Sequence, residues 1–227
     1  MPTAVALLVA AGRGERLGHD EPKALVPCAG RSLMGWSLDA LRAVDGVAHV
    51  VAALPAGITA PHGAIGVEGG AERSHSVRAA LRAAPASDWV LVHDAARPLV
   101  TPAIAQACLD ALAEHDCDAA IAAAPVADTI KEGAGEVVVR TLDRTRLWAI
   151  QTPQAFRRDA LERALGLGDA ALAAATDDAS LIESFGGEVR LVPTTPQNFK
   201  VTTPEDLHLA ELILRDRLAR GSETNLG

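Results

Sequence analysis

The sequence is poor in aromatic residues, and this limits the kind of core that it can build. Tyrosine is absent, Trp and Phe occur three times each, and aromatic residues make up 3% of the 227 positions. The 49% hydrophobic content therefore rests on small aliphatic side chains, above all alanine, which let helices pack closely on a sheet. A chain of this length and composition supplies an adequate core for one large α/β domain. We expect residues 1–227 to form a single domain.

An excess of positive charge and long apolar runs are also missing. The formal net charge is −8, which argues against nucleic acids and anionic membrane surfaces as partners, because both require a basic footprint. No apolar run approaches the roughly 20 residues of a membrane-spanning helix. Residues 1–11 lack the basic region of a signal peptide and continue directly into a charged segment. We therefore expect a cytoplasmic protein.

Cysteine is scarce, with three residues at positions 28, 108 and 117. An odd number of widely spaced cysteines, without a C-x-x-C pair or a nearby metal-ligand pattern, excludes a disulfide framework and a zinc site of the usual spacing. We predict reduced and mostly buried thiols.

The segment AAGRGERLG, residues 10–18, is the first motif that indicates chemistry. It follows an apolar run over residues 4–9, which is typical of a buried parallel strand. Small residues at such a break let backbone N–H groups turn toward an anion. Arg13, Arg16 and Lys23 add positive charge near the glycines. The segment predicts a cradle for a triphosphate, although an ordinary tight turn remains the alternative.

Two better-known phosphate loops do not fit this segment. A Walker loop needs Lys and Ser or Thr after its last glycine, whereas His19 follows Gly18. A dinucleotide loop has the spacing G-x-G-x-x-G, whereas the spacing here is G-x-G-x-x-x-G, and the predicted strand over residues 47–54 ends without a ribose-binding acid. A P-loop ATPase and a hydride-transfer enzyme are therefore disfavoured.

The rest of the chain alternates between strand and helix patterns, which favours an α/β fold with a mostly parallel sheet. We expect further strands ending near residue 68 and over residues 89–93, 118–124 and 188–192. Predicted helices cover residues 32–43, the segment from the double glycine to about 84, 102–114, a short stretch from 176 to about 186, and 203–221. In the last helix, the spacing predicts that Leu207, Ala210, Leu214 and Leu218 face the core.

Two segments between these elements carry candidate ligands. The double glycine Gly69-Gly70 lies before a helix start and can hold a base or ribose, while Ser74 serves equally well as a helix cap. Asp94 emerges at the carboxyl end of a strand, where open α/β sheets bind ligands, and it is the natural magnesium anchor beside a triphosphate. The alternative is a structural ion pair with Arg97. His93 is expected to be a packed strand residue.

The alternation of strand and helix patterns is interrupted over residues 128–150. Two short strand patterns flank Gly133 and Gly135 with no helix to cover them, which predicts a projecting β-hairpin arm. An exposed Val-rich face on such an arm favours pairing with a second subunit. We expect a homodimer that forms through the arm, and a flexible tail over residues 222–227.

Nine motifs in one order cover almost the whole chain: AAGRGERLG, PK, GGAERSHSV, VLVHDAARPLV, DTIK, DRTRLW, QTPQAF, TDDASLIE and NFKVTTPEDL. In the order and content of these motifs, the chain resembles the 2-C-methyl-D-erythritol 4-phosphate cytidylyltransferases of the non-mevalonate isoprenoid pathway. The resemblance implies a Rossmann-like twisted sheet flanked by helices, and a homodimer joined by the arm. It implies the reaction of CTP with methylerythritol phosphate to give CDP-methylerythritol and pyrophosphate, with Mg²⁺ or another divalent cation.

The resemblance also implies roles for individual residues. Arg16 and Lys23 are expected to stabilise the α-phosphate in the transition state, and Asp94 to hold the metal. Expected nucleotide ligands are Ala10, Ala11, Gly12, Arg13, Gly14, Gly69, Gly70, Ser76, Asp94 and Ala95. Expected ligands of the polyol phosphate are Arg97, Thr129, Arg144, Thr152, Thr176 and Lys200, with Thr129 and Arg144 supplied by the partner subunit.

Two positions depart from the family pattern, and two other functions stay open. Ala24 replaces a common Gln, and Ala71 replaces a polar residue that offers a ribose or base contact. A ribitol-phosphate cytidylyltransferase shares several of the motifs. A nucleotide-binding regulatory protein without catalysis is the alternative from a different class. The joint presence of Arg16, Lys23, Asp94 and Lys200 argues against it, because a binder does not need all these charges.

Overall fold

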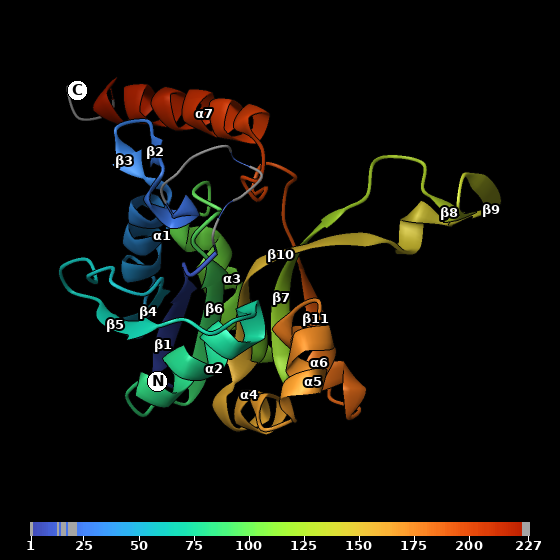
Figure 1. Ribbon diagram of the computed structural model, residues 1–227, viewed down its shortest axis with the longest axis horizontal. Helices are drawn as coiled ribbons and strands as arrows, with labels where there is room; N and C mark the ends of the chain where they lie inside the picture. The colour runs from blue at the N-terminus through green and yellow to red at the C-terminus, as the bar shows by residue number, and fades with distance from the viewer. Residues whose placement is uncertain (1, 13, 15–16, 18–21, 224–227) are drawn as a thin grey trace.

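The structure is a computed structural model that describes residues 2–12, 14, 17 and 22–223 (Figure 1). Its centre is a seven-stranded sheet in the order β11-β7-β10-β6-β1-β4-β5. The strands are β1 (Ala4–Val9), β4 (Val47–Leu54), β5 (Ile65–Glu68), β6 (Trp89–Asp94), β7 (Ala119–Pro125), β10 (Trp148–Arg157) and β11 (Val189–Pro193). The predicted strands are all present, and β10 is an additional one.

Most of the sheet is parallel, as predicted. Strand β1 lies between β4 and β6, and all three run in the same direction, with Val9 opposite Asp94 and Ala53. Their carboxyl ends therefore meet at one edge of the sheet. Strand β10 is the exception, because it runs antiparallel to both of its neighbours, β6 and β7.

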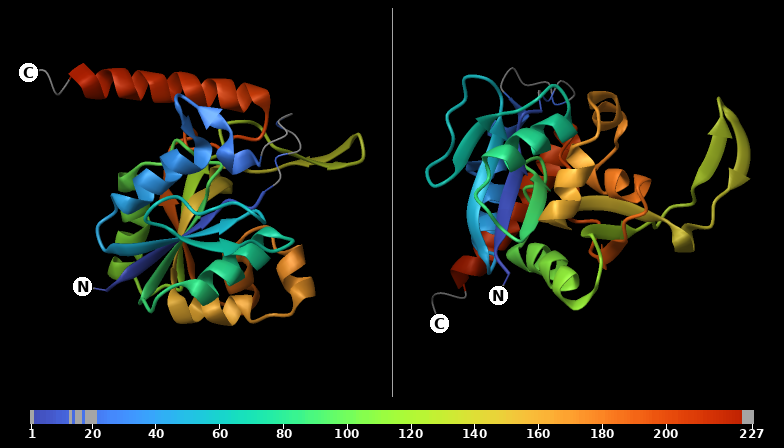
Figure 2. Two further views of the ribbon diagram at one scale, coloured as in Figure 1. Left: turned by 60° about the vertical axis from the view of Figure 1, so that its left-hand side comes forward. Right: turned by 90° about the horizontal axis from the view of Figure 1, so that it is seen from below.

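Helices cover both faces of the sheet (Figure 2). On one face, α1 (Leu33–Arg42) and α3 (Pro102–Glu114) enclose a core of buried Ala, Leu and Val side chains. On the other face, α2 (Arg73–Ala83), α4 (Arg158–Leu165), α5 (Asp169–Ala174) and α6 (Asp178–Ser184) enclose a second core. Strand β7 contributes AAIAAA, residues 119–124, almost entirely buried. Small side chains at the centre of the sheet thus bring the helices close to it, as the composition predicts.

Helix α7 (Pro204–Glu223) lies apart from these layers, over the short hairpin of β2 (Pro27–Cys28) and β3 (Arg31–Ser32) (Figure 1). Its Ala210 and Leu214 are buried in a third cluster with residues of the hairpin. Leu218 is 51% exposed, so its predicted place in the core is wrong. The helix continues past Gly221 to Glu223, and residues 224–227 of the predicted tail lie outside the described residues.

The arm is a two-stranded hairpin of β8 (Lys131–Ala134) and β9 (Val137–Thr141) that projects from the body (Figures 1 and 2). Val137, Val138 and Val139 are 71%, 59% and 58% exposed. The predicted α/β fold with a projecting hairpin is therefore confirmed. The arm has an apolar surface that the subunit itself leaves uncovered.

Two smaller predictions are also tested by the structure. The three cysteines are free and buried, and burial raises the pKa of Cys28 to about 11 and that of Cys108 to about 12. The thiols are therefore protonated at neutral pH. Within the described ranges, no helix is both long and apolar enough to span a bilayer.

Candidate active site

Two adjoining cavities open at the edge where the parallel strands end. The first, of about 510 Å³, is lined by the loop after β1, Lys23, the start of α2, Asp94 with the two alanines that follow it, and Lys200. The second, of about 610 Å³, is lined by residues of β10, by Arg97, and by Thr176 and its neighbours before α6. Arg73, Asp94 and Lys200 line both cavities. These three side chains therefore form the boundary between them.

The loop after β1 forms one wall of the first cavity. Ala10 donates its backbone N–H to the carbonyl of Ala53 at 2.9 Å, which continues the parallel pairing and fixes where the loop begins. Gly14 has φ +72°, and a β-carbon on it would lie 2.6 Å from Cβ of Lys23. Glycine is needed there for both its conformation and its size. Ala11 and Gly12 also line this cavity, whereas the predicted residues Arg13 and Arg16 lie outside the described residues.

The Gly69-Gly70 turn forms the facing wall and nearly touches the loop. A β-carbon on Gly69 would lie 2.3 Å from Cβ of Ala11. The turn is held by Ser76, whose Oγ accepts the N–H of Gly70 at 3.1 Å, and Gly70 and Ser76 line the cavity. The alternative of Ser74 as a helix cap is wrong, because Glu72 is the N-cap residue of α2 and makes no side-chain cap bond.

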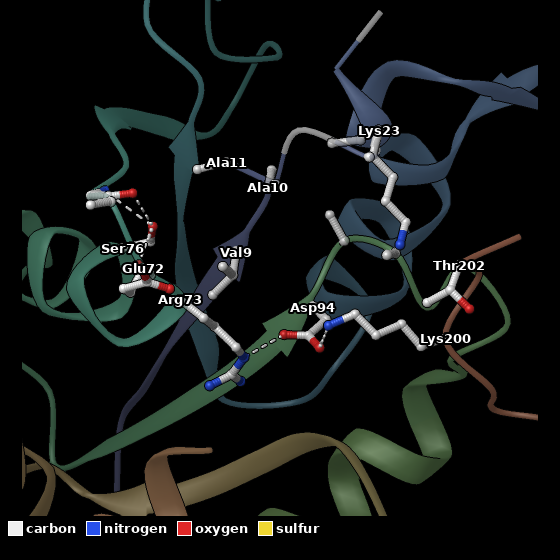
Figure 3. A pocket seen from close by; sticks show the side chains of 17 residues that line it. Val9, Ala10, Ala11, Lys23, Glu72, Arg73, Ser76, Asp94, Lys200 and Thr202 are labelled. Atoms are coloured by element: carbon white, nitrogen blue, oxygen red, sulfur yellow. Dashed lines mark hydrogen bonds and ion pairs between the residues drawn. The ribbon is translucent and has the colours of Figure 1, made fainter. Parts of the chain in front are cut away.

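Asp94 lies at the centre of the site, at the end of β6. Its carboxylate accepts from Nε of Arg73 through Oδ1 and from Nζ of Lys200 through Oδ2, both at 2.8 Å. Figure 3 shows the two cations approaching it from opposite sides. Burial alone would raise the pKa of Asp94, but Arg73 and Lys200 hold it well below its usual range. The group is therefore a carboxylate at every pH of interest.

The alternative pairing of Asp94 with Arg97 is not formed. The guanidinium of Arg97 donates to the carbonyl of Asn198 at 2.8 Å and to that of Ile150 at 3.3 Å. Arg97 thus braces the segment before Lys200 and lines the second cavity. The arginine that pairs with Asp94 is Arg73, a residue that the sequence analysis did not single out.

Arg73 also reaches a second buried carboxylate. Its Nη1 donates to Oδ2 of Asp178 at 2.5 Å, and Asp178, the first residue of α6, has a fully buried side chain. One signal in the sequence marked this arginine. A cation in the first turn of a helix faces the positive end of the helix dipole, which is unfavourable unless anions compensate.

Thr152 lies beneath Asp94 in the middle of β10. Its Oγ1 accepts the backbone N–H of Asp94 at 3.0 Å and lies 3.1 Å from Nδ1 of His93. Nε2 of His93 faces the carbonyl of Arg97 at 3.3 Å, so the ring proton is on Nε2 and the Thr152 hydroxyl donates to Nδ1. His93 is fully buried, which confirms it as a packed residue. Burial lowers its pKa to about 4.

The second cavity gathers four predicted substrate ligands, which are Arg97, Thr152, Thr176 and Lys200. A buried amide network holds the segment before Lys200 in place. Oε1 of Gln151 accepts from Nδ2 of Asn198 at 3.0 Å, and the same Nδ2 donates to the carbonyl of Thr152 at 2.9 Å. The network ties the Lys200 segment to β10.

The two predicted ligands on the arm line neither cavity. Thr129 and Arg144 are exposed, and Arg144 donates to the carbonyl of Ala127 at the base of the arm. Ala95 does line the first cavity, next to Asp94. Of the predicted set, one subunit therefore brings together the described residues of the loop with those of the turn, β6, β10 and the Thr176 and Lys200 segments.

Comparison with known proteins places the chain in a family. The family model for 2-C-methyl-D-erythritol 4-phosphate cytidylyltransferase matches residues 4–216. The proteins of that name from Deinococcus radiodurans and Saccharopolyspora erythraea are 49% and 45% identical to the chain, over 93% and 92% of it and over 90% and 98% of their own lengths.

Solved structures agree with the sequence comparison. The cytidylyltransferase of the same name from Thermus thermophilus is 36% identical with a TM-score of 0.78, covering 95% of this chain and 100% of that one. The enzyme from Francisella tularensis has a TM-score of 0.80 at 29% identity, covering 92% and 99%. The chain therefore belongs to the family of 2-C-methyl-D-erythritol 4-phosphate cytidylyltransferases.

Proposed function

We propose that the chain transfers the cytidylyl group of CTP to 2-C-methyl-D-erythritol 4-phosphate, giving CDP-methylerythritol and pyrophosphate for isoprenoid precursor synthesis. The observation that carries the proposal is the pair of adjoining cavities with Asp94, Arg73 and Lys200 between them. Two phosphate-bearing substrates bound on either side meet at this boundary. We propose the cytoplasm as the location, because CTP is supplied there.

The first cavity suits the nucleotide. The backbone of Ala10, Ala11, Gly12 and Gly14 takes the triphosphate, joined by Arg13. The Gly69-Gly70 turn, held by Ser76, takes the cytidine, and Asp94 and Ala95 form the floor. Lys23, on the wall opposite α2 (Figure 3), and Arg16 stabilise charge on the α-phosphate as it becomes crowded.

The second cavity suits the polyol phosphate. Arg97, Thr176 and Lys200 offer donors to its phosphate and hydroxyl groups, and Thr152 supports the floor through its bond to Asp94. The attacking phosphate monoester is already largely dianionic at neutral pH, since its second pKa is about 6. The reaction therefore needs no general base, and the task of the protein is to hold two anions in line.

Homodimerisation through the arm completes the second cavity in this proposal. The support comes from the three exposed valines of β9 and from the position of Thr129 and Arg144, which line neither cavity of their own subunit. If the arm of one subunit lies against its partner, both residues reach the substrate of the neighbouring site.

The side chains around the first cavity can hold a divalent cation through one protein ligand. Within the described residues, no three His, Cys, Asp or Glu side chains gather as a metal cage, and Mg²⁺ in nucleotide sites is held by one or two carboxylates together with substrate phosphates. Two of the described carboxylate residues, Glu72 and Asp94, line the first cavity. Asp94 lies at the end of β6, next to the loop after β1, and its partner Lys200 has a 40% exposed side chain. We propose that Asp94 holds Mg²⁺, which neutralises triphosphate charge when bound.

A pyrophosphate-release assay tests the function. Each of the four ribonucleoside triphosphates is paired with methylerythritol phosphate and with ribitol phosphate, with Mg²⁺ or excess chelator. We expect turnover with CTP and methylerythritol phosphate and its loss in chelator. Equal or faster turnover of ribitol phosphate would identify the other cytidylyltransferase. Binding of CTP without any turnover would identify a regulatory protein, and full activity in chelator would remove the metal role of Asp94.

A further inference from the structure

Arg73 is the first residue of α2, and its side chain crosses from the nucleotide wall to the opposite side of the site. Nε binds the carboxylate of Asp94 at 2.8 Å, and Nη1 binds that of Asp178 at 2.5 Å. The three residues come from α2, the end of β6 and the start of α6. One guanidinium therefore connects three of the elements that line the two cavities.

The burial of this cluster makes the connection rigid. The side chain of Arg73 is 22% exposed, that of Asp94 8% and that of Asp178 0%. An arginine side chain stays protonated in a protein, so Arg73 is a permanent cation between the two carboxylates. The planar fork of an arginine holds two carboxylates at once, which the single ammonium of a lysine cannot do with the same geometry.

The charge of Asp178 is compensated by Arg73 to a greater extent than the charge of Asp94 is. Among the ion pairs of the described residues, Asp94 has a second cation in Lys200, whereas Asp178 has Arg73 alone. Burial raises the pKa of Asp178, and its Oδ1 is buried with no hydrogen-bond partner in the described structure. Without Arg73, Asp178 takes up a proton or moves toward water.

A shift of Asp178 would also displace residues that line the second cavity. Asp177, its neighbour, caps α6 through the N–H of Ser180 and accepts from Nε2 of Gln154 at 2.8 Å. Thr176 precedes Asp177 and lines the second cavity. A shift at the start of α6 therefore carries Thr176 with it.

We propose that Arg73 is a positioning residue for the transfer reaction, which fixes the carboxylate of Asp94 on one side and the Thr176 segment on the other. The inference rests on the proposed function and assigns Arg73 a role in that reaction. Both guanidinium nitrogens named above are engaged by protein carboxylates. Arg73 thus acts through Asp94 and Asp178.

The test compares Arg73→Gln, Asp178→Asn and the double variant with the wild-type protein. Arg78→Gln is the matched control, since Arg78 lies on the same helix, pairs with the exposed Asp169 and lines neither cavity. For each protein, the urea midpoint, kcat and the KM of both substrates are measured. Arg73→Lys is included as a variant that retains the charge but not the fork.

We expect Arg73→Gln to lower kcat by about 10- to 100-fold, as displacements near 1 Å do at reacting centres, and to raise the KM for methylerythritol phosphate. The double variant removes the unpaired charge, so its urea midpoint should recover while its kcat should not. Arg73→Lys should fold with kcat lowered by about tenfold or more.

Three outcomes would overturn the inference. Recovery of kcat together with the midpoint in the double variant would show that Arg73 only balances the charge of Asp178. A rise confined to the KM for CTP would show a direct phosphate contact. Wild-type kinetics in Arg73→Gln or Arg73→Lys would show that the position of the guanidinium is unimportant. Failure of the proposed function is a separate result, in which the wild-type protein itself has no turnover.

Discussion

Buried His93 makes the stability of the fold depend on pH in a predictable direction. Burial is the main cause of its lowered pKa, Asp94 acts in the opposite direction, and Arg97 adds to the lowering. The folded protein titrates this ring near pH 4, compared with 6.5 for an ordinary histidine. A histidine with a depressed folded pKa contributes its full stability above the unfolded pKa. That contribution is lost as the pH falls from about 6.5 toward 4.

The size of the loss follows from the two pKa values. At pH 5, about 97% of unfolded chains carry the proton on this ring, compared with about a tenth of folded chains. The difference in proton binding corresponds to about 2 kcal/mol of unfolding free energy between about pH 7.5 and pH 5. Most of the loss therefore occurs while the ring in the folded protein is still neutral.

Urea unfolding of the wild-type protein and His93→Gln at about pH 7.5 and pH 5 measures the effect. The glutamine can still accept from Thr152 but does not titrate. From about pH 7.5 to pH 5, we expect the unfolding free energy of the wild-type protein to fall by about 2 kcal/mol more than that of the variant. His49→Gln, at an exposed histidine of β4, is the control and should follow the wild-type curve. Parallel losses in the wild-type protein and His93→Gln would refute the burial argument.

Three further predictions concern the proposed reaction. Lys23→Ala should lower kcat by about 100-fold, because lost transition-state donors typically cost about 3 kcal/mol; a change confined to the KM for CTP would place Lys23 in ground-state binding. Gly69→Ala should weaken CTP binding in calorimetry, because its Cβ would lie 2.3 Å from Cβ of Ala11 and the turn or the loop must shift to relieve an overpacking cost of about 1–3 kcal/mol. Gly168→Ala is the control, because a β-carbon at that position has no atom within 4 Å, and it should leave CTP binding unchanged. Equal losses of CTP affinity in the two variants would refute the steric explanation. Mixing inactive Arg144→Ala with inactive Lys23→Ala should restore about a quarter of wild-type activity, because half of randomly exchanged dimers have one intact site of two. No recovery despite confirmed exchange would place Arg144 outside the partner's site.

The sequence predicted the parallel part of the sheet and the place of Asp94 at its carboxyl edge, because both leave local signals. Apolar runs over residues 4–9 and 47–54 coincide with β1 and β4. Asp94 follows such a run directly, and parallel strands end at a common edge. The contacts of Asp94 were not predictable in the same way, because Arg73 and Lys200 come from segments 21 and 106 residues away.

Strand β10 was missed for a different reason. Its sequence WAIQTPQAFR contains a proline and several polar residues, which normally argue against a central strand. The pairing with β7 is interrupted between Ile150 and Gln154, so Pro153 does not have to donate to the ladder. The polar side chains of Gln151 and Thr152 are satisfied by Asn198 and His93. Only the assembled fold supplies those partners.

The insertion of β10 between β6 and β7 has a consequence for the order in which the protein takes shape. When residue 125 has been synthesised, β7 has neither of its sheet neighbours, because β10 and β11 are still to come. The first four strands can associate, yet the sheet stays in two parts until residues 148–157 join them. The support under Asp94 from Thr152 arrives with β10 itself, and the ion pair of Asp94 with Lys200 forms later still. A nascent chain therefore has the loop after β1 long before the residues of the candidate active site have come together.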